Sequence, residues 1–281
     1  MGEREGLGEA FHGPGLLKVV ETERPVPGPT EILARVQAAG VNPTDWKTRA
    51  RGRFATGAEP PFTLGYDVSG IVEATGPGVT VFEPGDEVFG MPRFLHPAGA
   101  YAEYVTAPAR HFAHRPEALD HLQVAAVPLA ALTAWQALVD TADVQPGRRV
   151  MIHAAAGGVG HLAVQIAKAE AVHDVDVVLD TIGGPYGERS LRTLRRGGTL
   201  ISILPPDATV PAEQARAAGV RAVFMLVEPD QAGLRRIAAL VDSGRLRVEV
   251  AAVLPLENAA EAHAFGEAGR TTGKIVLSVA P

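Results

Sequence analysis

The sequence predicts an α/β protein with two domains, one with an antiparallel, barrel-type sheet and one with a mostly parallel sheet. In the first hundred or so residues, turn-forming glycine and proline clusters separate short alternating runs, a pattern typical of antiparallel strands. After Pro116, strand-like and helix-like segments alternate, which favours crossover connections and a parallel sheet. We therefore assign residues 1–115 and 265–281 to the barrel-type domain and residues 116–264 to the parallel-sheet domain.

The elements of the first domain are assigned from its turns. Glycine- and proline-rich turns are expected at residues 13–15, 25–29, 76–78 and 84–86. Between them, residues 31–36 and 68–73 have the alternating or β-branched pattern of strands. The last segment, residues 273–279, returns to strand character and is expected to rejoin this domain.

The elements of the second domain follow from apolar periodicity. Residues 119–139 carry apolar positions at helical spacing, and residues 150–152 form a short, buried strand. Helices and strands then alternate, with helices expected at 188–195 and 232–243 and strands at 175–179, 199–204, 220–227 and 248–254.

Composition excludes several classes of function. The 281 residues include 26 Lys and Arg against 32 Asp and Glu, a net charge of −6, and the basic residues are dispersed, which disfavours a nucleic-acid partner. The longest apolar run, residues 124–132, is interrupted by Pro128 and is too short to span a membrane. No secretory signal is visible, so we expect a cytoplasmic protein. Because there is no cysteine, disulfides, thiolate zinc sites and a cysteine nucleophile are excluded.

Residues 149–160 carry the strongest functional signal, a strand that runs into a glycine turn and then a helix. In the G-x-G-x-x-G template, Ala155 takes the first place, Gly157 the second and Gly160 the third. Gly157 would let the backbone approach a diphosphate, and Gly160 would let the helix pack closely on the strand. Free N–H groups and the helix dipole would then face the phosphates. We predict a dinucleotide site; the alternative is a glycine-rich turn without a ligand.

Asp180 is an acidic residue at a spacing that dinucleotide-binding folds use. In such folds, an acid roughly 20 residues after the glycine turn ends the second strand and binds the adenosine ribose. Asp180 closes a strand-like run at about that distance. Taken alone, it predicts NAD.

Six further blocks of sequence carry a family resemblance. They are residues 39–47 (AGVNPTDWK), 65–72 (GYDVSGIV), 84–90 (PGDEVFG), 99–104 (GAYAEY), 132–138 (LTAWQAL) and 180–184 (DTIGG). With the glycine turn, they make nearly the whole chain after Phe11 resemble the zinc-independent quinone oxidoreductases of the medium-chain dehydrogenase/reductase superfamily. The resemblance implies a GroES-like barrel-type domain, a Rossmann-like cofactor domain, NADPH as cofactor with NADH as the alternative, and a homodimer.

The resemblance also implies a reaction, the transfer of a hydride from the nicotinamide to a quinone or an activated α,β-unsaturated carbonyl. Zinc-dependent relatives hold their metal with a cysteine after the first Gly-Val block and with a His-Glu pair. Here those places read Val41-Asn42 and Tyr66-Asp67, so we expect no metal site. A second hypothesis stays open, a dinucleotide-binding or interaction protein of the same fold that has lost catalysis.

Site residues are assigned by the same resemblance. Asn42 and Thr133 receive catalytic roles, Asn42 on the nicotinamide side and Thr133 under the ring. Contacts with the acceptor are assigned to Trp46, Phe54, Tyr66 and Tyr101. Contacts with the cofactor are assigned to Pro43, Thr44, Lys47, Thr133, Gly157, Gly158, Val159, Gly160, Thr181, Ile203, Leu204, Gly273 and Lys274.

Simpler roles compete with some of these assignments. Asn42 could form an Asx turn, Lys47 could be a surface charge, and buried tyrosines are often packing residues with a satisfied hydroxyl. In enoyl-thioester reductases of the superfamily, a tyrosine after the Asn-Pro block supplies a proton. The matching place here is Phe54, and a phenyl ring cannot donate a proton. This favours quinones or activated enones, whose reduced forms can take a proton from water.

The resemblance exposes a missing stretch between residues 168 and 174. Relatives have a second strand, a helix and a third strand there, on the order of 30 residues, and in their register Asp180 ends the fourth strand. Either the segment belongs to the protein and is missing from the sequence as written, or the chain lacks an edge of its sheet. We favour the first explanation, because an adenosine pocket without its second strand is hard to reconcile with dinucleotide affinity.

Overall fold

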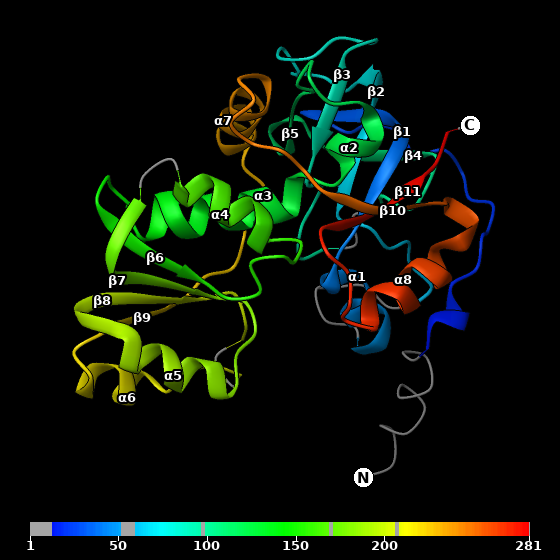
Figure 1. Cartoon of the computed structure of the whole chain (residues 1–281). Coiled ribbons are helices and arrows are strands. Elements are labelled where there is room, and N and C mark those ends of the chain that lie inside the picture. The colour runs from blue at the N-terminus through cyan, green and yellow to red at the C-terminus, as the bar shows by residue number, and fades with distance from the viewer. Residues whose placement is uncertain (1–12, 52–59, 97–98, 169–170, 206–207, 281) are drawn as a thin grey trace. The chain divides into compact units, whose positions relative to one another are not determined.

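The structure, a computed structural model, describes residues 13–51, 60–96, 99–168, 171–205 and 208–280 (Figure 1). The chain divides into two compact units, each combining segments that are far apart in the sequence. Unit 1 comprises Met1–Leu129, Pro229–Gly244 and Val248–Pro281, and unit 2 comprises Ala130–Glu228 and Arg245–Arg247. The sheet of unit 1 is mostly antiparallel and that of unit 2 is parallel, as the sequence predicts.

Unit 1 is organised around one long central strand. Its described strands are β1 (Glu31–Val41), β2 (Asp67–Thr75), β3 (Glu87–Gly90), β4 (Tyr104–Pro108), β5 (Phe112–His114), β10 (Val250–Pro255) and β11 (Lys274–Ser278). They follow the order β10-β11-β1-β2-β3-β5, and β4 also pairs with β1. β1 pairs antiparallel with β2, β4 and β11, whereas β10 and β11 are parallel. The end of the chain therefore rejoins the first domain, as predicted for residues 273–279.

Side chains cap two of the described helices of unit 1. The described helices are η1 (Pro14–Leu16), α1 (Pro43–Arg51), η2 (Ala109–His111), α2 (His121–Ala125), α7 (Gln231–Asp242), η5 (Leu256–Asn258) and α8 (Ala259–Glu267). Asp120 forms a capping box with Gln123 at the start of α2, and Asp230 accepts two backbone N–H groups at the start of α7. α1 starts with Pro43, whose missing N–H is no loss at a first helical position.

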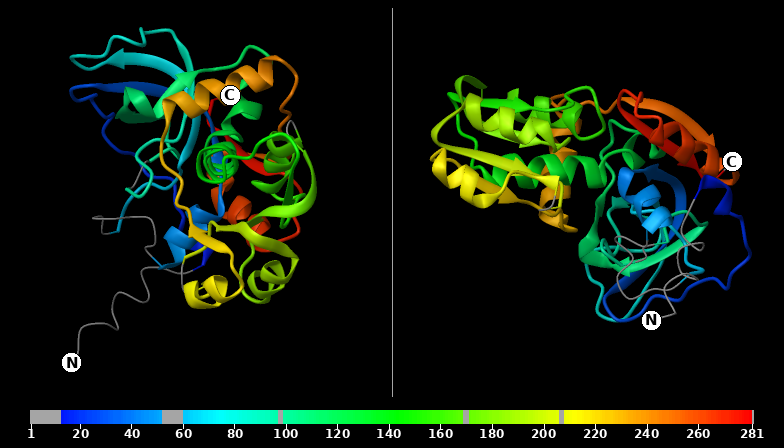
Figure 2. Two further views of the ribbon diagram at one scale, coloured as in Figure 1. Left: turned by 90° about the vertical axis from the view of Figure 1, so that its left-hand side faces the viewer. Right: turned by 90° about the horizontal axis from the view of Figure 1, so that it is seen from below.

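Unit 2 contains a parallel sheet whose described strands follow chain order (Figures 1 and 2). Its elements are α3 (Pro128–Trp135), η3 (Gln136–Thr141), β6 (Arg148–Ile152), α4 (Gly160–Lys168), β7 (Ala171–Asp180), α5 (Pro185–Thr193), β8 (Leu194–Ser202), α6 (Ala212–Ala217) and β9 (Arg221–Phe224). The strand order is β6-β7-β8-β9, and each neighbouring pair is parallel.

The helices of unit 2 lie on both faces of this sheet. Figures 1 and 2 show α4 on one face and α5 and α6 on the other. Because spatial order equals chain order, the crossover through α4 has the opposite hand to the two crossovers that follow it. About 98% of such crossovers are right-handed, so at least one connection here departs from the rule.

The missing stretch falls at the connection between α4 and β7. α4 ends at Lys168, β7 begins at Ala171, and β7 pairs directly with β6. Residues 169 and 170 lie outside the described residues. Within the described residues, the sheet of unit 2 therefore has no strand between α4 and β7, and both explanations of the missing stretch stay hypotheses.

Two segments assigned to the parallel-sheet domain belong to unit 1 instead. The predicted helix at 232–243 is α7, which packs against β5, and the predicted strand at 248–254 is β10, which pairs with β11. The segment around α2 also joins unit 1, because α2 packs on β1, β2 and β11. The predicted helix at 119–139 is divided into α2, α3 and η3, with α3 starting at Pro128.

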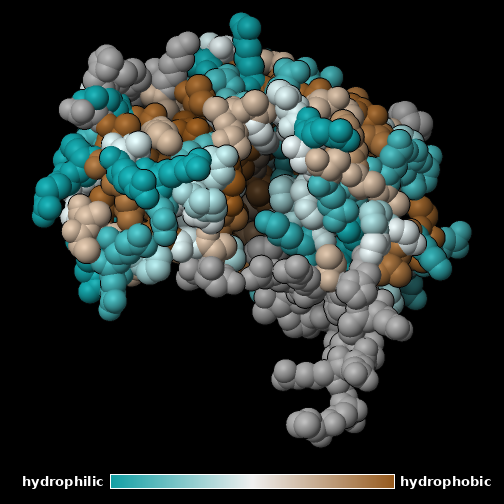
Figure 3. All heavy atoms as spheres, turned by 60° about the horizontal axis from the view of Figure 1, so that its bottom comes forward, coloured by the Kyte–Doolittle hydropathy of each residue, from teal (hydrophilic) through white to brown (hydrophobic). Residues whose placement is uncertain are grey.

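The surface carries polar groups over all the elements in view. On the face drawn in Figure 3, hydrophilic residues are interspersed with smaller apolar areas. Within the described ranges, no helix combines the length and the apolar character needed to span a bilayer.

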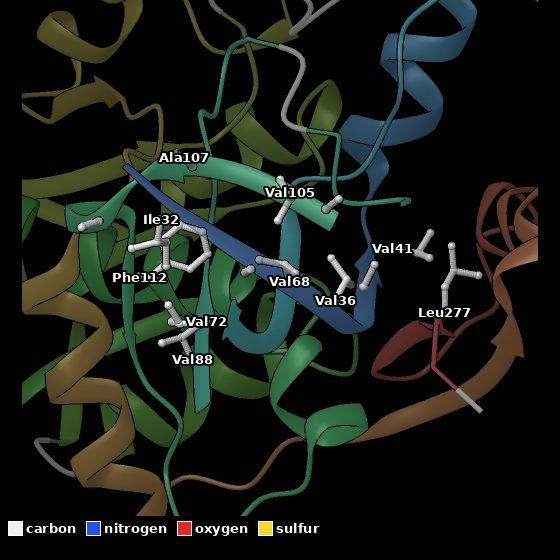
Figure 4. Close-up of a cluster of buried hydrophobic side chains, with 14 of the residues drawn as sticks. Ile32, Val36, Val41, Val68, Val72, Val88, Val105, Ala107, Phe112 and Leu277 are labelled. Carbon is white, nitrogen blue, oxygen red and sulfur yellow. The ribbon is translucent and has the colours of Figure 1, made fainter. Parts of the chain in front are cut away.

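The core of unit 1 lies along β1. Figure 4 shows the inward side chains of β1, β2, β3, β4 and β5 meeting in one cluster, which includes Ile32, Val68, Val72, Val88, Val105 and Phe112. Val41 at the end of β1 and Leu277 of β11 extend the cluster to the point where β1 stops. The next residue is Asn42, so the first predicted site residue stands on a rigid strand end.

Candidate functional site

The glycine turn lies at the carboxyl end of β6, as the sequence predicts. Gly157 N–H donates to the carbonyl oxygen of Ala154 (2.8 Å), and His161 N–H donates to the carbonyl oxygen of Gly157 (3.1 Å). Residues 154–156 are exposed, and Gly157 to Val159 are partly exposed. The turn therefore presents its backbone outward at the start of α4, where N–H groups attract anions.

Gly160 is required by close packing. A Cβ atom at this position would lie 2.1 Å from the carbonyl oxygen of Ala154 and 2.8 Å from the Cα atom of Ala155. Because both are backbone atoms, no side-chain rotation can relieve the contact. At Gly157 the corresponding Cβ would lie 3.2 Å from the same Ala154 oxygen, which is tight but within reach of a small adjustment. These distances agree with the helix–strand packing predicted for Gly160.

Three more predicted cofactor residues lie at the same edge of the sheet. Thr181 follows β7, and its hydroxyl donates to the carbonyl oxygen of His153 (3.0 Å). Ile203 and Leu204 follow β8, and Ile203 N–H donates to the carbonyl oxygen of Asp180 (3.3 Å). The structure thus brings these residues together with the glycine turn at the carboxyl ends of parallel strands, the edge where open α/β sheets bind ligands.

A second predicted group lies in unit 1, around Asn42. The Asn42 side chain is buried; its Nδ2 donates to Asp67 Oδ2 (2.8 Å), and its Oδ1 accepts from Lys274 Nζ. Lys274 Nζ also donates to the carbonyl oxygen of Val41 (3.2 Å) and lies 3.5 Å from Asp67 Oδ2. Burial raises the pKa of Asp67 and lowers that of Lys274, and their attraction opposes both shifts. The Lys274 ammonium is engaged inside unit 1, so its contact with the cofactor stays a prediction.

Asp45 is a buried carboxyl in the first turn of α1. Its Oδ2 accepts the Asn42 N–H (2.7 Å), while its Oδ1 is buried and has no hydrogen-bond partner at normal distance among the described residues. Burial, opposed by the Asn42 hydrogen bond and reinforced by the charge of Asp67, raises the pKa of Asp45 to about 7. The attraction of Lys274 and the nearby Tyr101 hydroxyl lower this pKa to a smaller degree. Asp45 is therefore a group that titrates near neutral pH.

Replacing Asp45 by asparagine is expected to change how stability depends on pH. A carboxyl whose pKa is raised on folding stabilises the folded state at low pH, and this contribution is lost as pH rises from about 4 to about 7. The stability of Asp45→Asn relative to the wild type should therefore rise by at most about 4 kcal/mol between pH 4 and pH 8. Urea unfolding at several pH values measures it. Glu117→Gln, which removes an exposed carboxylate, is the matched control, and equal pH slopes for Asp45→Asn and the wild type would contradict the assignment.

A network that the sequence did not indicate joins α1, α8 and Tyr101. Arg49 donates to His263 Nδ1 (2.9 Å) and to Glu267 Oε1 (2.7 Å), and His263 Nε2 lies 3.2 Å from the Tyr101 hydroxyl. Because an arginine can only donate, Nδ1 accepts, and Nε2–H donates to Tyr101. Burial, with a smaller effect of Arg49, lowers the pKa of His263 to about 3, so the ring is neutral. Burial raises the pKa of Tyr101 well above its usual value, and the charge of Asp45 adds to this shift.

Two other predicted acceptor contacts, Tyr66 and Trp46, are packing residues in unit 1. Tyr66 is 1% exposed, its hydroxyl lies 3.5 Å from Thr48 Oγ1, and its ring meets Phe94 edge-on. Trp46 is partly buried and meets the His263 ring edge-on. Phe54 lies outside the described residues. These positions support the simpler role for Tyr66 and leave acceptor contacts by all four aromatic residues as predictions.

The remaining predicted residues have differing surroundings. Pro43 and Lys47 are exposed on α1, and Thr44 has a buried Oγ1 without a hydrogen-bond partner among the described residues. Gly273 immediately precedes β11. Thr133 is buried in α3, within unit 2. Within the part of the chain that the structure describes, no three histidine, aspartate or glutamate side chains gather in a group that could hold a metal ion.

Comparison with protein families gives two matches that together cover most of the chain. Residues 28–117 match the alcohol dehydrogenase GroES-like domain, and residues 159–277 match the zinc-binding dehydrogenase domain. The first match falls in unit 1. The second begins at Val159, at the end of the glycine turn, and runs through β7, β8 and β9 of unit 2 to β10 and β11 of unit 1.

Curated relatives include quinone oxidoreductases of nearly the same extent. The quinone oxidoreductase of Pongo abelii is 30% identical over 318 aligned positions, which cover 95% of this chain and 95% of that protein. The chain is also 33% identical over 311 positions to the pikromycin polyketide synthase component PikAII of Streptomyces venezuelae, but it spans only 8% of that protein. The 318 aligned positions exceed the 281 residues of this chain by 37, so the Pongo relative carries at least 37 residues without a counterpart here.

Solved structures give the same answer. The quinone oxidoreductase of Coxiella burnetii has a TM-score of 0.88 and 34% identity, and the match covers 96% of this chain and 97% of that one. The quinone oxidoreductase of Escherichia coli, solved in complex with NADPH, has a TM-score of 0.83 and 26% identity, with 96% and 98% covered. The chain thus belongs to the quinone oxidoreductases of the medium-chain dehydrogenase/reductase superfamily, a family of NAD(P)H oxidoreductases.

Proposed function

We propose that this protein is a metal-free reductase that uses NADPH or NADH to transfer a hydride to a quinone or an activated α,β-unsaturated carbonyl. The observation that carries the proposal is the glycine turn, which presents backbone N–H groups at the start of α4 and packs so closely that Gly160 admits no side chain. Support comes from relatives of nearly the same extent named quinone oxidoreductase and from the Escherichia coli relative in complex with NADPH.

The residues that would hold the cofactor lie at the carboxyl edge of the sheet of unit 2. The N–H groups of Gly158 and Val159 would receive the diphosphate, and Gly157 would let the backbone approach it. Thr181 and the segment after β8 line the same edge. Once bound, the reduced nicotinamide supplies the hydride. The catalytic roles of Asn42 and Thr133 are proposed from the resemblance alone.

Quinones are the acceptors best supported by the state of the tyrosines. Tyr101 is held between His263 and Asp45, and Tyr66 is almost fully buried beside Thr48. A hydroxyl in such a network is less available to a bound acceptor than one that points into open space. A reduced quinone needs no dedicated donor because it can take its proton from water. This argument ranks quinones above acceptors that need a positioned proton donor.

Chelation tests whether the reaction is metal-free. The positions that hold zinc in metal-dependent relatives are Val41-Asn42 and Tyr66-Asp67 here, and Asn42 and Asp67 are bonded to each other. Dialysis against a strong chelator is therefore expected to leave turnover unchanged, measured against protein dialysed without it. Loss of activity that returns on adding Zn²⁺ would overturn the metal-free assignment.

The experiment that tests the proposed function is a cofactor oxidation assay with a panel of small quinones and a panel of enones. We expect oxidation of NADPH or NADH that depends on at least one quinone. If the cofactor binds but neither panel is reduced, the second hypothesis, a dinucleotide-binding protein of the same fold without catalysis, replaces this one. The direct β6–α4–β7 connection is the observation that favours that alternative. A homodimer is also proposed, and light scattering tests it.

A further inference from the structure

The edge of unit 2 that carries the glycine turn fits one half of a dinucleotide better than the other. In dinucleotide-binding sheets, the diphosphate meets the glycine turn, and an acid or an arginine near the end of the second strand contacts the adenosine ribose or its 2′-phosphate. The turn supplies the first contact, through the backbone at Gly158 and Val159, which are partly exposed at the start of α4. The contact with the ribose would fall to Asp180, at the end of β7, because Asp180 has the expected spacing from the glycine turn.

Asp180 is already bound within the protein. Its Oδ1 accepts hydrogen bonds from Gly183 N–H (2.9 Å), Ile182 N–H (3.0 Å) and His153 Nδ1 (2.9 Å). The side chain is 1% exposed, and Oδ2 is buried without a hydrogen-bond partner among the described residues. A ribose hydroxyl therefore has no path to either oxygen unless the turn after β7 opens.

His153 holds Asp180 in this position. Its Nε2 lies 3.3 Å from Ser190 Oγ, and the Ser190 hydroxyl donates to the carbonyl oxygen of Tyr186 (2.7 Å). The imidazole is thus fixed between α5 and the end of β7, with the Tyr186 ring edge-on at 5.4 Å. Asp180 closes the turn after β7 and anchors α5 through His153, which is a structural role.

No other strand supplies the missing contact among the described residues. β6 has β7 as its neighbour, and the strands continue in one direction to β9. The chain passes from Lys168 at the end of α4 to Ala171 at the start of β7, and the Pongo abelii relative has at least 37 residues without a counterpart in this chain (318 aligned positions against 281). In dinucleotide-binding sheets, the residue that selects between ribose and 2′-phosphoribose lies near the end of the second strand, and the resemblance places that strand between α4 and β7.

We infer that unit 2 recognises the diphosphate of its cofactor and does not select at the adenosine 2′ position, so that NADPH and NADH bind with the same affinity. This inference rests on the proposed function, because it assumes that a reduced nicotinamide dinucleotide binds at the glycine turn. A 2′-phosphate would not meet the Asp180 carboxylate, which is buried and engaged within the protein.

Isothermal titration of the full chain with NADPH, NADH and adenosine 2′,5′-bisphosphate tests the inference without any turnover. We expect dissociation constants for NADPH and NADH within fivefold of each other, and no competition by the bisphosphate, which has a 2′-phosphate but no diphosphate. A preference of more than fivefold for either dinucleotide overturns the inference and leaves the proposed function intact. Absence of binding by both dinucleotides overturns the proposed function and the inference with it.

Asp180→Asn provides a second measurement. If Asp180 held a ribose, this variant would weaken the binding of NADH more than the binding of NADPH. The ratio of the two dissociation constants would then shift. Because Asp180 faces His153 and two backbone N–H groups, we expect the ratio of the two dissociation constants to stay unchanged even if the fold is weakened. Ser190→Ala, which alters the other partner of His153, is the matched control; a ratio shifted by Asp180→Asn and not by Ser190→Ala contradicts the inference.

Discussion

Replacing Gly160 by alanine is expected to destabilise unit 2 by about 3 kcal/mol and to abolish the binding of NADPH. The added Cβ would stand 2.1 Å from the carbonyl oxygen of Ala154, and 2.8 Å from the Ala154 carbonyl carbon and from Ala155 Cα. All three atoms belong to the backbone of the turn, so the start of α4 must move away from the end of β6. Such a movement breaks the alignment of N–H groups that the diphosphate needs. Thermal unfolding and NADPH titration measure the two effects.

Gly157→Ala is the informative companion, because it separates folding from binding. Its Cβ would lie 3.2 Å from the Ala154 oxygen, a contact that a shift of a few tenths of an ångström relieves. We therefore expect a small loss of stability. The methyl group would nevertheless stand where the backbone approaches the diphosphate, so affinity for NADPH should fall by about tenfold or more.

Gly15→Ala is the control for both variants, since a Cβ at Gly15 meets nothing within 4 Å and the residue lies in unit 1. It should leave unfolding and binding unchanged. Wild-type stability in Gly160→Ala would mean that the turn can relax. Wild-type affinity in Gly157→Ala would mean that the diphosphate does not approach at this glycine.

The features that could be predicted from the sequence are those encoded within a few neighbouring residues. The strand, glycine turn and helix over residues 149–160 are contiguous, so periodicity and glycine spacing specify them together. Element types were also predictable for β7, β8 and α7, whose apolar patterns are regular. The assignment of elements to sheets was less certain. Residues 248–254 read as a strand in either domain, and only the partner β11 places β10 in unit 1.

The buried polar groups of unit 1 show why half of the candidate site could not be predicted. Lys274 and Asn42 meet across 232 positions of sequence, and Arg49 and His263 across 214. Nothing in the local pattern around His263 distinguishes it from a surface histidine of an amphipathic helix. A weak signal was present at Asp67, a carboxylate between apolar residues at the start of a strand, because such a group must find partners when buried.

The short connection between α4 and β7 was visible in the sequence, but its meaning was not. Comparison with the family predicted a gap, and the structure pairs β7 directly with β6 at that place. The consequence is physical. One face of the sheet is covered by α4 and the other by α5 and α6, although the strands follow chain order, so crossovers of opposite hand coexist in one sheet.

Lys274→Met is expected to be the most destabilising change in unit 1, at about 3–5 kcal/mol. Lys274 is 4% exposed and is the cation beside Asp67, which is fully buried. Without the ammonium, Asp67 keeps hydrogen bonds from Asn42 Nδ2 (2.8 Å) and Leu129 N–H (2.7 Å), but its charge has lost its counterion. A buried carboxylate without a counterion destabilises the folded state. The Asn42 side chain also loses the hydrogen-bond partner of its Oδ1.

The double variant Asp67→Asn with Lys274→Met should be more stable than Lys274→Met alone, because the unpaired charge has been removed together with its partner. The cost of Lys274→Met should also shrink at acidic pH. Burial already raises the pKa of Asp67, and removing Lys274 raises it further, so in this variant Asp67 takes up a proton first as pH falls and becomes neutral. Urea unfolding at pH 5 and pH 8 of four proteins, the wild type, Asp67→Asn, Lys274→Met and the double variant, completes the double-mutant cycle. Additive effects at both pH values would mean that Lys274 and Asp67 do not act as a pair, and that the rigid setting of Asn42 has another origin.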